Sequence, residues 1–389
     1  MSAFVQKIRA KVTFAGQVLI WRWLQLGARS ITATEPSLVL VPCEPRSVIG
    51  SRGDEAMIYA VLGDFRKRHP AGRITVVCTH PVDAVSSPRS PYDDLRRLQA
   101  DFPGLEFVPA WHGHNPLPKI AAAIRDAQAT ELYAIGADCM DGFYDPKVSL
   151  NLLAAADLAV RMGVKTRLTG FSFNASPKPQ VVRLFRHASP ELRFNLRDAI
   201  SLERFEVLTK RRGTLVADTA FCLEPKFSER VNFWLDQMAA DRKAGKKVLG
   251  FNLNPLLKAK TNIDEKVEWL KAKGDETSVY LVPHDYRGEG DLGELEKVVA
   301  KLPRAKIVRD VLSAAELKAL MSGVDSLFTQ RMHLGIAALG MGKPIEYDAY
   351  QGKFEGLMRH FRRCERCEKC EGLEKVMKLA RKNLVGDDE

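Results

Sequence analysis

The stretch Ser326-Leu-Phe-Thr-Gln-Arg-Met-His-Leu-Gly-Ile-Ala-Ala-Leu-Gly-Met-Gly-Lys-Pro-Ile345 decides the fold class, because it holds a strand, a helix and a second strand in succession. The apolar run Ser326–Phe328 is typical of a short buried strand, and the small apolar residues of Leu334–Leu339 continue as a helix. The glycines that follow end this helix, and Pro344 begins another extended segment. This order predicts a βαβ unit of a parallel sheet.

Short apolar runs alternate with helical periods along the rest of the chain, which predicts parallel sheets throughout. The other predicted strands are Ser37–Val41, Ile74–Cys78, Glu106–Val108, Glu131–Ile135, Thr166–Phe171, Phe194–Leu196, Val248–Leu253, Ser278–Val282 and Lys306–Val308. The predicted helices pass through Ala56 and Leu62 and cover Tyr92–Ala100, Leu117–Ala127, Val148–Met162, Ala199–Leu208, Arg230–Ala244, Ile263–Lys273, Leu292–Leu302 and Ala314–Met321. We therefore expect an α/β protein with two Rossmann-like domains facing a cleft, and ligands at the carboxyl ends of the strands.

The 389 residues suit two or three domains. The alternation pauses at a change of composition in 218–228, which we interpret as a linker. The predicted segments are an N-terminal amphipathic segment 1–35, an α/β domain 36–217, the linker 218–228, a second α/β domain 229–360 and a cysteine-containing helical tail 361–389.

The net charge of +11 favours anionic partners such as phosphorylated metabolites or anionic lipid surfaces. The excess of Lys and Arg is scattered and no zinc-finger spacing occurs, so we expect no nucleic-acid partner. Four of the seven cysteines lie singly in or beside apolar runs, as reduced buried cysteines do. Together with the absence of a secretory leader, this predicts a cytoplasmic protein.

The N-terminal segment is apolar from Val12 to Ala28 but is interrupted by Gln17, Arg22 and Gln25. These interruptions argue against a membrane-spanning helix. Tryptophans with flanking cations suit a helix that lies on an anionic membrane, and packing against the body of the protein suits the pattern equally well. Peripheral contact with the inner face of the membrane therefore stays open.

A candidate anion site lies where the helix of the opening stretch begins. Arg331 and His333 precede or enter the first turn of that helix, beside backbone N–H groups that have no helical partner. Lys353 adds a second cation one short strand later. These three residues are our first candidates for binding a substrate.

Other polar side chains follow the ends of predicted strands. Arg52 and Asp54 lie in a glycine-containing loop at a helix start, where the carboxylate could cap the helix or bind a sugar hydroxyl. The remaining candidates, which we expect at the same cleft, are Asp138, Asp141, Arg197 and His284.

Two further motifs suggest other chemistry. The run Gly288-Glu-Gly-Asp-Leu-Gly293 is formally a dinucleotide-binding motif, but its carboxylates would repel a pyrophosphate and its glycines do not follow the strand directly. Cys364, Cys367 and Cys370, with His360 upstream, could hold zinc or an iron–sulfur cluster, or could simply lie on one face of a helix. We expect no resident cofactor and leave the metal open.

Several sequence blocks together resemble the polysaccharide pyruvyltransferase family. In chain order they are Gly53-Asp-Glu-Ala56, Arg197-Asp198 with Ser201, Asp218-x-Ala220, Pro283-His284, Arg309-Asp310 with Glu316-Leu317, Arg331-Met-His333 through Pro344, and Tyr350-x-x-Lys353. The resemblance runs from about residue 45 to 360. It departs from the family where Ile135-Gly-Ala-Asp138 replaces a run of glycines.

This resemblance implies a GT-B-like fold, with the sugar acceptor on the N-terminal domain and phosphoenolpyruvate as co-substrate on the C-terminal one. The reaction implied is transfer of a pyruvyl group onto a sugar of a polysaccharide, or of its lipid-linked precursor, as a ketal. Arg331 and Lys353 would bind the anionic groups of the donor. His333 would protonate its methylene, and Asp54, or else Asp138, would take the proton of the acceptor hydroxyl.

Three alternatives remain. A nucleotide-sugar glycosyltransferase of GT-B type often carries two glutamates with seven residues between them, whereas Glu346 and Glu355 here have eight between them. A non-catalytic glycan-binding relative would account for the altered Gly-Ala-Asp loop. A metal-dependent redox protein would account for the cysteines alone.

Overall fold

The computed structural model describes residues 3–80, 92–113, 115–287, 290–348, 353–361 and 371–385. The chain divides into two compact units. Unit 1 comprises Met1–Gly50, Met57–Thr219 and Leu379–Glu389, and unit 2 comprises Ser51–Ala56 and Ala220–Lys378. The first turn of one helix therefore belongs to unit 2, although the rest of that helix belongs to unit 1.

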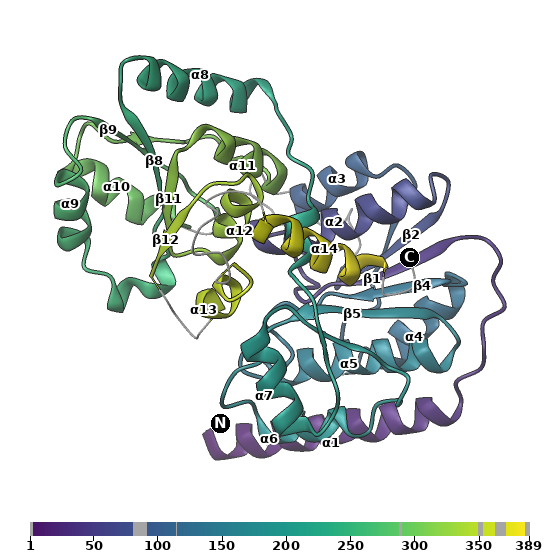
Figure 1. Ribbon diagram of the computed structural model, residues 1–389. Helices are drawn as coiled ribbons and strands as arrows, with labels where there is room; N and C mark the ends of the chain where they lie inside the picture. The colour runs from purple at the N-terminus through teal and green to yellow at the C-terminus, as the bar shows by residue number, and fades with distance from the viewer. Residues whose placement is uncertain are drawn as a thin grey trace. The chain divides into compact units, whose positions relative to one another are not determined.

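Unit 1 contains a seven-stranded parallel sheet in the order β3-β2-β1-β4-β5-β6-β7 (Figure 1). Its strands are β1 (Ser37–Val41), β2 (Arg73–Val77), β3 (Leu105–Val108), β4 (Glu131–Ala134), β5 (Lys165–Phe171), β6 (Phe194–Leu196) and β7 (Thr214–Leu215). Its helices are α1 (Ala3–Leu26), α2 (Arg52–Arg68), α3 (Tyr92–Asp101), α4 (Leu117–Asp126), α5 (Pro146–Arg161), α6 (Pro179–Phe185) and α7 (Ala199–Thr209). Every residue of β1 is buried, as expected for a strand covered by helices on both faces.

Unit 2 contains a five-stranded parallel sheet in the order β10-β9-β8-β11-β12. Its strands are β8 (Lys247–Phe251), β9 (Thr277–Leu281), β10 (Lys306–Ile307), β11 (Ser326–Thr329) and β12 (Ile345–Tyr347). Its helical segments are η2 (Thr219–Cys222), α8 (Glu229–Lys243), η3 (Pro255–Lys260), α9 (Ile263–Lys271), α10 (Leu292–Lys301), α11 (Ala314–Leu320), η4 (Met321–Gly323), α12 (Met332–Gly340), α13 (Lys353–Met358) and α14 (Glu371–Val385). The last residues of α14 are assigned to unit 1.

Two apolar clusters cover opposite faces of the unit 2 sheet. Val248 and Leu327 belong to the cluster beneath α8, α11 and α12, whereas the next residues along these strands, Leu249 and Phe328, belong to the cluster beneath α9 and α10. This alternation follows the two-residue period of a strand. It decides which residues point into each layer, and the parallel pairing of β8 with β9 and β11 places the carboxyl ends of these strands at a common edge.

Both strand orders are those of a doubly wound sheet. The order reverses between β1 and β4 in unit 1 and between β8 and β11 in unit 2. Ligands of such sheets bind beside the carboxyl ends of the strands at the reversal point. We therefore expect ligands beside the loops that follow β1, β4, β8 and β11.

The predicted α/β fold with parallel sheets is confirmed. The structure adds elements that the sequence pattern did not indicate, among them α6, β7 and α13. β7 has only two residues, too few to show any period, and α6 is a seven-residue helix that begins at a proline. A cleft between the two domains stays a prediction.

Helix α1 packs against α4 and α5, so the N-terminal segment is part of unit 1. Trp21 is fully buried, and its Nε1 donates a hydrogen bond of 2.9 Å to Asp157 on α5. None of the helices in the described part of the chain combines the length and the hydrophobicity that crossing a bilayer requires.

Candidate active site

The N-terminus of α12 lies at the reversal point of the unit 2 sheet, directly after β11. Arg331 is its N-cap residue, in extended conformation, and no side chain caps the helix. Thr329 accepts a hydrogen bond from the backbone N–H of Arg331 instead. The following N–H groups, including that of His333, are therefore arranged as they are in anion sites at helix starts.

The guanidinium of Arg331 does not point into open space. It donates to Asp291 at 2.5 Å, and it lies 3.5 Å from a carboxylate oxygen of Asp285. The side chain of Asp291 is fully buried and that of Arg331 is 13% exposed. The positive charge predicted to attract a substrate is thus balanced within the protein.

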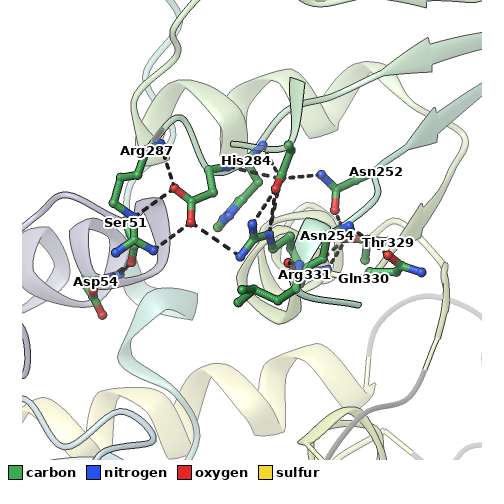
Figure 2. A network of polar contacts seen from close by, with 12 residues as sticks. Ser51, Asp54, Asn252, Asn254, His284, Arg287, Thr329, Gln330 and Arg331 are labelled. Carbon is green, nitrogen blue, oxygen red and sulfur yellow. Dashed lines mark hydrogen bonds and ion pairs between the residues drawn. The ribbon is translucent and has the colours of Figure 1, made fainter. Parts of the chain in front are cut away.

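Sequence reasoning missed the polar network that contains Asn252, His284 and Arg331 (Figure 2), and Asp291 binds all three of these residues. It accepts hydrogen bonds from the backbone N–H groups of His284 and Asp285 and from the amide of Asn252. Asn252 in turn accepts from Thr329. One carboxylate therefore ties together the loops after β8, β9 and β11. The sequence showed Asp291 only as a charge unsuited to a pyrophosphate, because nothing local connects it to Arg331.

Asn254 lies at the same reversal point, after β8. Its backbone N–H donates to Gln330 at 2.8 Å, and its side-chain oxygen accepts from Leu256. Its Nδ2 is buried and meets no hydrogen-bond acceptor among the described residues. A buried amide donor in this state is costly unless a water or a ligand satisfies it, so Asn254 joins the list of candidates.

Arg52 lies in the first turn of α2 and is held by three contacts. Its Nε donates to the carbonyl oxygen of Leu312 at 2.7 Å, its Nη1 pairs with Glu55 at 2.8 Å, and its guanidinium lies 5.1 Å from the ring centroid of Tyr286. Glu55 also accepts from the backbone N–H of Ala314, the first residue of α11. These contacts fix the turn that carries Arg52 and Asp54 to the start of α11.

Gly53 brings the backbone of this turn against the imidazole of His333. A Cβ atom built on Gly53 would lie 2.5 Å from Nδ1 of His333 and 2.9 Å from Cε1. No residue except glycine allows so close an approach without displacing the ring. Two blocks that carry the family resemblance, almost 300 residues apart in sequence, therefore meet at one point.

A small pocket of about 10 Å³ lies behind this contact. Its polar lining consists of Arg52, His284, Lys318 and His333, and the remaining lining is apolar. This volume is roughly that of one water molecule. The pocket is therefore too small for a phosphorylated acid.

Burial, followed by the electrostatic effects of Arg331 and of His333, lowers the pKa of His284 well below its ordinary value of 6.5. His284 is therefore a neutral imidazole at neutral pH. Lys318, which sequence reasoning also missed, donates to the carbonyl oxygens of Phe221 and Leu223 at 2.8 and 2.7 Å, and burial lowers its pKa. Both side chains line the pocket, and their primary role is structural.

Asp54 is half-buried and exchanges hydrogen bonds with Ser51, the residue before α2 (Figure 2). It lies in the same turn as Arg52 and Gly53. Unit 2 thus brings together Arg52, Asp54, His284, Arg331 and His333. Lys353 begins α13, and its side chain lies outside the described residues.

The remaining predicted site residues, Asp138, Asp141 and Arg197, belong to unit 1. Asp138 and Asp141 lie in the loop after β4, at the reversal point of that sheet. Asp141 is buried and accepts from the backbone N–H groups of Phe143 and Asn174 and from the amide of Asn174, and burial raises its pKa. Asp138 is more exposed and accepts from Tyr144 at 3.1 Å.

Arg197 forms a buried ion pair of 2.9 Å with Asp218 and also donates to Ser172. Both members belong to the family blocks quoted above. Both side chains of this pair are buried, so its primary role is structural. The pair holds the end of β6 against the segment that follows β7.

The cysteine cluster Cys364, Cys367 and Cys370 lies outside the described residues. Within the described ranges, no group of three or more His, Cys, Asp or Glu side chains is arranged to hold a metal ion. Of the cysteines in the described ranges, Cys43 and Cys78 are buried, Cys139 and Cys222 are half-buried, and none of these four forms a disulfide.

Comparisons with solved structures agree with the fold. A protein assigned as a UDP-N-acetylglucosamine 2-epimerase from Listeria monocytogenes matches with a TM-score of 0.54 and 10% identity, covering 90% of this chain and 91% of that one. Anabaena Alr3699/HepE, solved with UDP-glucose, matches with a TM-score of 0.50 and 14% identity over 89% of both chains. S. aureus MnaA, solved with UDP, matches with a TM-score of 0.50 and 10% identity, covering 91% and 89%.

These similarities, at low identity, establish the fold alone, which is α/β and GT-B-like. A search of curated proteins found no match. The family model described as polysaccharide pyruvyl transferase matches residues 52–345, a span that includes both the Gly53 and the His333 blocks. The chain belongs to the polysaccharide pyruvyl transferase family.

Proposed function

We propose that this protein transfers a pyruvyl group from phosphoenolpyruvate onto two hydroxyls of a sugar, forming a cyclic ketal on a polysaccharide or its lipid-linked precursor. The observation that carries the proposal is the contact between Gly53 and His333 at the uncapped N-terminus of α12. Family membership supports the reaction type, and the identity of the donor is our inference.

The donor would bind beside the half-buried side chains of His333 and Asp54, because the pocket lined by Arg52, His284, Lys318 and His333 is too small for it. The guanidinium groups of Arg52 and Arg331 are already paired with Glu55 and Asp291. The backbone N–H groups that open α12 would therefore take one anionic group of the donor. Lys353 is the cation we propose for the other, and the Nδ2 of Asn254 supplies a donor at the same strand ends.

His333 would donate a proton to the methylene carbon of phosphoenolpyruvate, which leaves C2 electron-deficient. A first sugar hydroxyl then adds to C2, and Asp54 takes its proton. A second hydroxyl then adds to C2 as the C2–O bond to the phosphate breaks, which closes the ketal ring. Its proton returns to His333, and the proton held by Asp54 leaves with the phosphate. The products are the pyruvylated sugar and inorganic phosphate.

The acceptor would bind to unit 1 beside Asp138. This carboxylate is more exposed than Asp141, whose oxygens serve the loop itself. Arg197 would act through its pair with Asp218 by keeping the neighbouring strand ends in place. Because phosphoenolpyruvate is a cytoplasmic metabolite, we place the reaction in the cytoplasm.

Calorimetry with the full-length protein and phosphoenolpyruvate tests donor binding without knowledge of the acceptor. We expect saturable binding, whereas UDP-glucose at the same concentration should not bind. Binding of UDP-glucose alone would instead identify a nucleotide-sugar glycosyltransferase, the activity suggested by the ligands of the similar structures. Binding of neither would support a non-catalytic glycan-binding relative.

Phosphate release in the presence of sugar acceptors then tests the chemistry. We expect His333→Ala to retain donor binding and to lower phosphate release by about 10²-fold or more, the usual contribution of a positioned general acid. His112→Ala is the matched control, because His112 is exposed and belongs to unit 1. Equal rates for wild type and His333→Ala would remove His333 from the chemistry.

A further inference from the structure

Helix α1 carries an exposed apolar stripe on the face turned away from unit 1. The stripe consists of Leu19, Trp23 and Leu26, which are 70%, 70% and 88% exposed. Their spacing of four and three residues places them on one side of a helix. A tryptophan and two leucines this open to water are unusual on a helix that is otherwise packed.

The rotation of α1 about its axis is fixed by its opposite face. Trp21 and Gln17 are buried against unit 1, and Trp21 donates to Asp157. Gln25 donates to the same carboxylate at 2.8 Å. The stripe therefore cannot turn inward without breaking a buried hydrogen bond, so its exposure is built into the fold.

A cationic basin of about 520 Å³ lies elsewhere on unit 1. Arg193, Lys210 and Arg212 line it with exposed side chains. Their neighbour Arg211 has a different role: it donates to the carbonyl oxygens of Phe185, Ala188 and Ser189 and lies over the ring of Phe194. Arg211 thus shapes the wall, and the other three cations face solvent.

The stripe and the basin lie at the same edge of the unit 1 sheet. The basin surrounds the first residues of β6 and β7, which is the amino edge of these parallel strands. The C-terminal half of α1 reaches this edge, because Arg22 and Gln25 contact His187, and Arg211 of the basin wall binds the next two carbonyl oxygens. Figure 1 shows α1 running along α5 toward the side where β1 begins.

The charged side chains at the N-terminus of the chain are all basic. The first 34 residues contain Lys7, Arg9, Lys11, Arg22 and Arg29 and no Asp or Glu. An apolar stripe with tryptophan, flanked by cations, is the composition of helices that lie in the interface of an anionic bilayer. Basic groups beside such a helix add electrostatic attraction to anionic lipids.

We propose that the stripe and the basin together form a surface that docks unit 1 onto an anionic lipid bilayer. Leu19, Trp23 and Leu26 enter the interface, and Arg193, Lys210 and Arg212 contact lipid phosphates. Such docking would leave the carboxyl edge of the sheet, where Asp138 lies, accessible to an acceptor. The proposal does not depend on the pyruvyl-transfer reaction.

Co-sedimentation of the full-length protein with vesicles tests this surface. We expect binding to phosphatidylcholine vesicles that contain phosphatidylglycerol, little binding to phosphatidylcholine alone, and weakening by added salt. Trp23→Ser with Leu26→Ser should weaken binding by about tenfold or more, and so should Arg193→Gln with Lys210→Gln and Arg212→Gln. Circular dichroism should show unchanged folding for both variants.

Matched controls remove the same kinds of group elsewhere. Phe227→Ser with Phe233→Ser removes two exposed aromatic residues of unit 2, and Lys243→Gln with Lys246→Gln and Lys247→Gln removes three exposed cations. Both controls should bind vesicles like wild type. Absence of binding by wild type, or equal losses in the controls, would overturn the proposal. A dimer in analytical ultracentrifugation that Trp23→Ser with Leu26→Ser dissociates, without vesicle binding, would assign the stripe to a second copy instead.

Discussion

The imidazole of His333 lies against the α-carbon of Gly53, so closely that a Cβ atom on Gly53 would lie 2.5 Å from Nδ1. Gly53 belongs to the first turn of α2 and His333 to the first turn of α12, and both turns belong to unit 2. This contact joins two helix starts into a single candidate site. It also explains in steric terms why a glycine stands at position 53.

Gly53→Ala should lower phosphate release by about 10²-fold, because a catalytic group displaced by about 1 Å loses activity on that scale. Gly63→Ala, in the same helix, is the control, since a Cβ atom there meets nothing within 4 Å. Helix propensity should make Gly63→Ala neutral or slightly stabilising. Full activity of Gly53→Ala would show that the position of the His333 ring is not critical.

Asp291→Asn should lower the free energy of unfolding by about 3 kcal/mol, because it leaves the guanidinium of Arg331 without its buried carboxylate. Urea denaturation measures the change. Asp275→Asn is the control, since Asp275 pairs with Arg304 at the surface with its side chain 94% exposed. A loss for Asp291→Asn no larger than that of the control would mean that the network around Asp291 contributes little to stability.

Of the two aspartates after β4, we expect Asp141 to contribute to stability and Asp138 to contribute to binding of the acceptor. Asp141→Ala should lower the free energy of unfolding by about 2 kcal/mol, because three hydrogen-bond donors lose their buried acceptor. Asp138→Ala should lower the free energy of unfolding by no more than about 1 kcal/mol, because the half-buried Asp138 carboxylate accepts from Tyr144 at 3.1 Å, and it should raise the KM for the acceptor. The reverse assignment in thermal unfolding and kinetics would place the acceptor contact on Asp141.

His284 should make stability depend on pH. Its pKa in the folded protein is lowered well below 6.5, so the unfolded chain takes up a proton at a higher pH than the folded one. Stability is therefore complete above about pH 6.5 and falls as the pH drops below it, by up to about 1.4 kcal/mol per pH unit for one proton. Denaturation curves between neutral and mildly acidic pH measure this slope.

The variant His284→Gln should flatten that slope, because glutamine does not titrate. His112→Gln, at an exposed position of unit 1, should leave it unchanged. The groups that act on His284 are Arg331, His333 and Arg52, which oppose its protonation, and Asp285, which favours it. The same slope in wild type and His284→Gln would assign the acid sensitivity to another group.

The sequence by itself determined the α/β class, the order of nearly all strands and helices, and the family blocks. These features are local: the apolar period of a strand or helix and the residues that end it lie within a few positions of one another. The run after Phe328 illustrates this, since α12 begins at Met332 and ends at Gly340, where the small residues and glycines placed it.

Only the tertiary structure decided which charged side chains remain available to bind a substrate. Arg331 was expected to attract a substrate, yet Asp291, 40 residues away, balances its charge. The direction of the α1 stripe, the neutral state of His284 and the contact of Gly53 with His333 likewise depend on residues distant in sequence. Burial, pairing of charges and close backbone approach arise when separate segments pack together, and no local period records them.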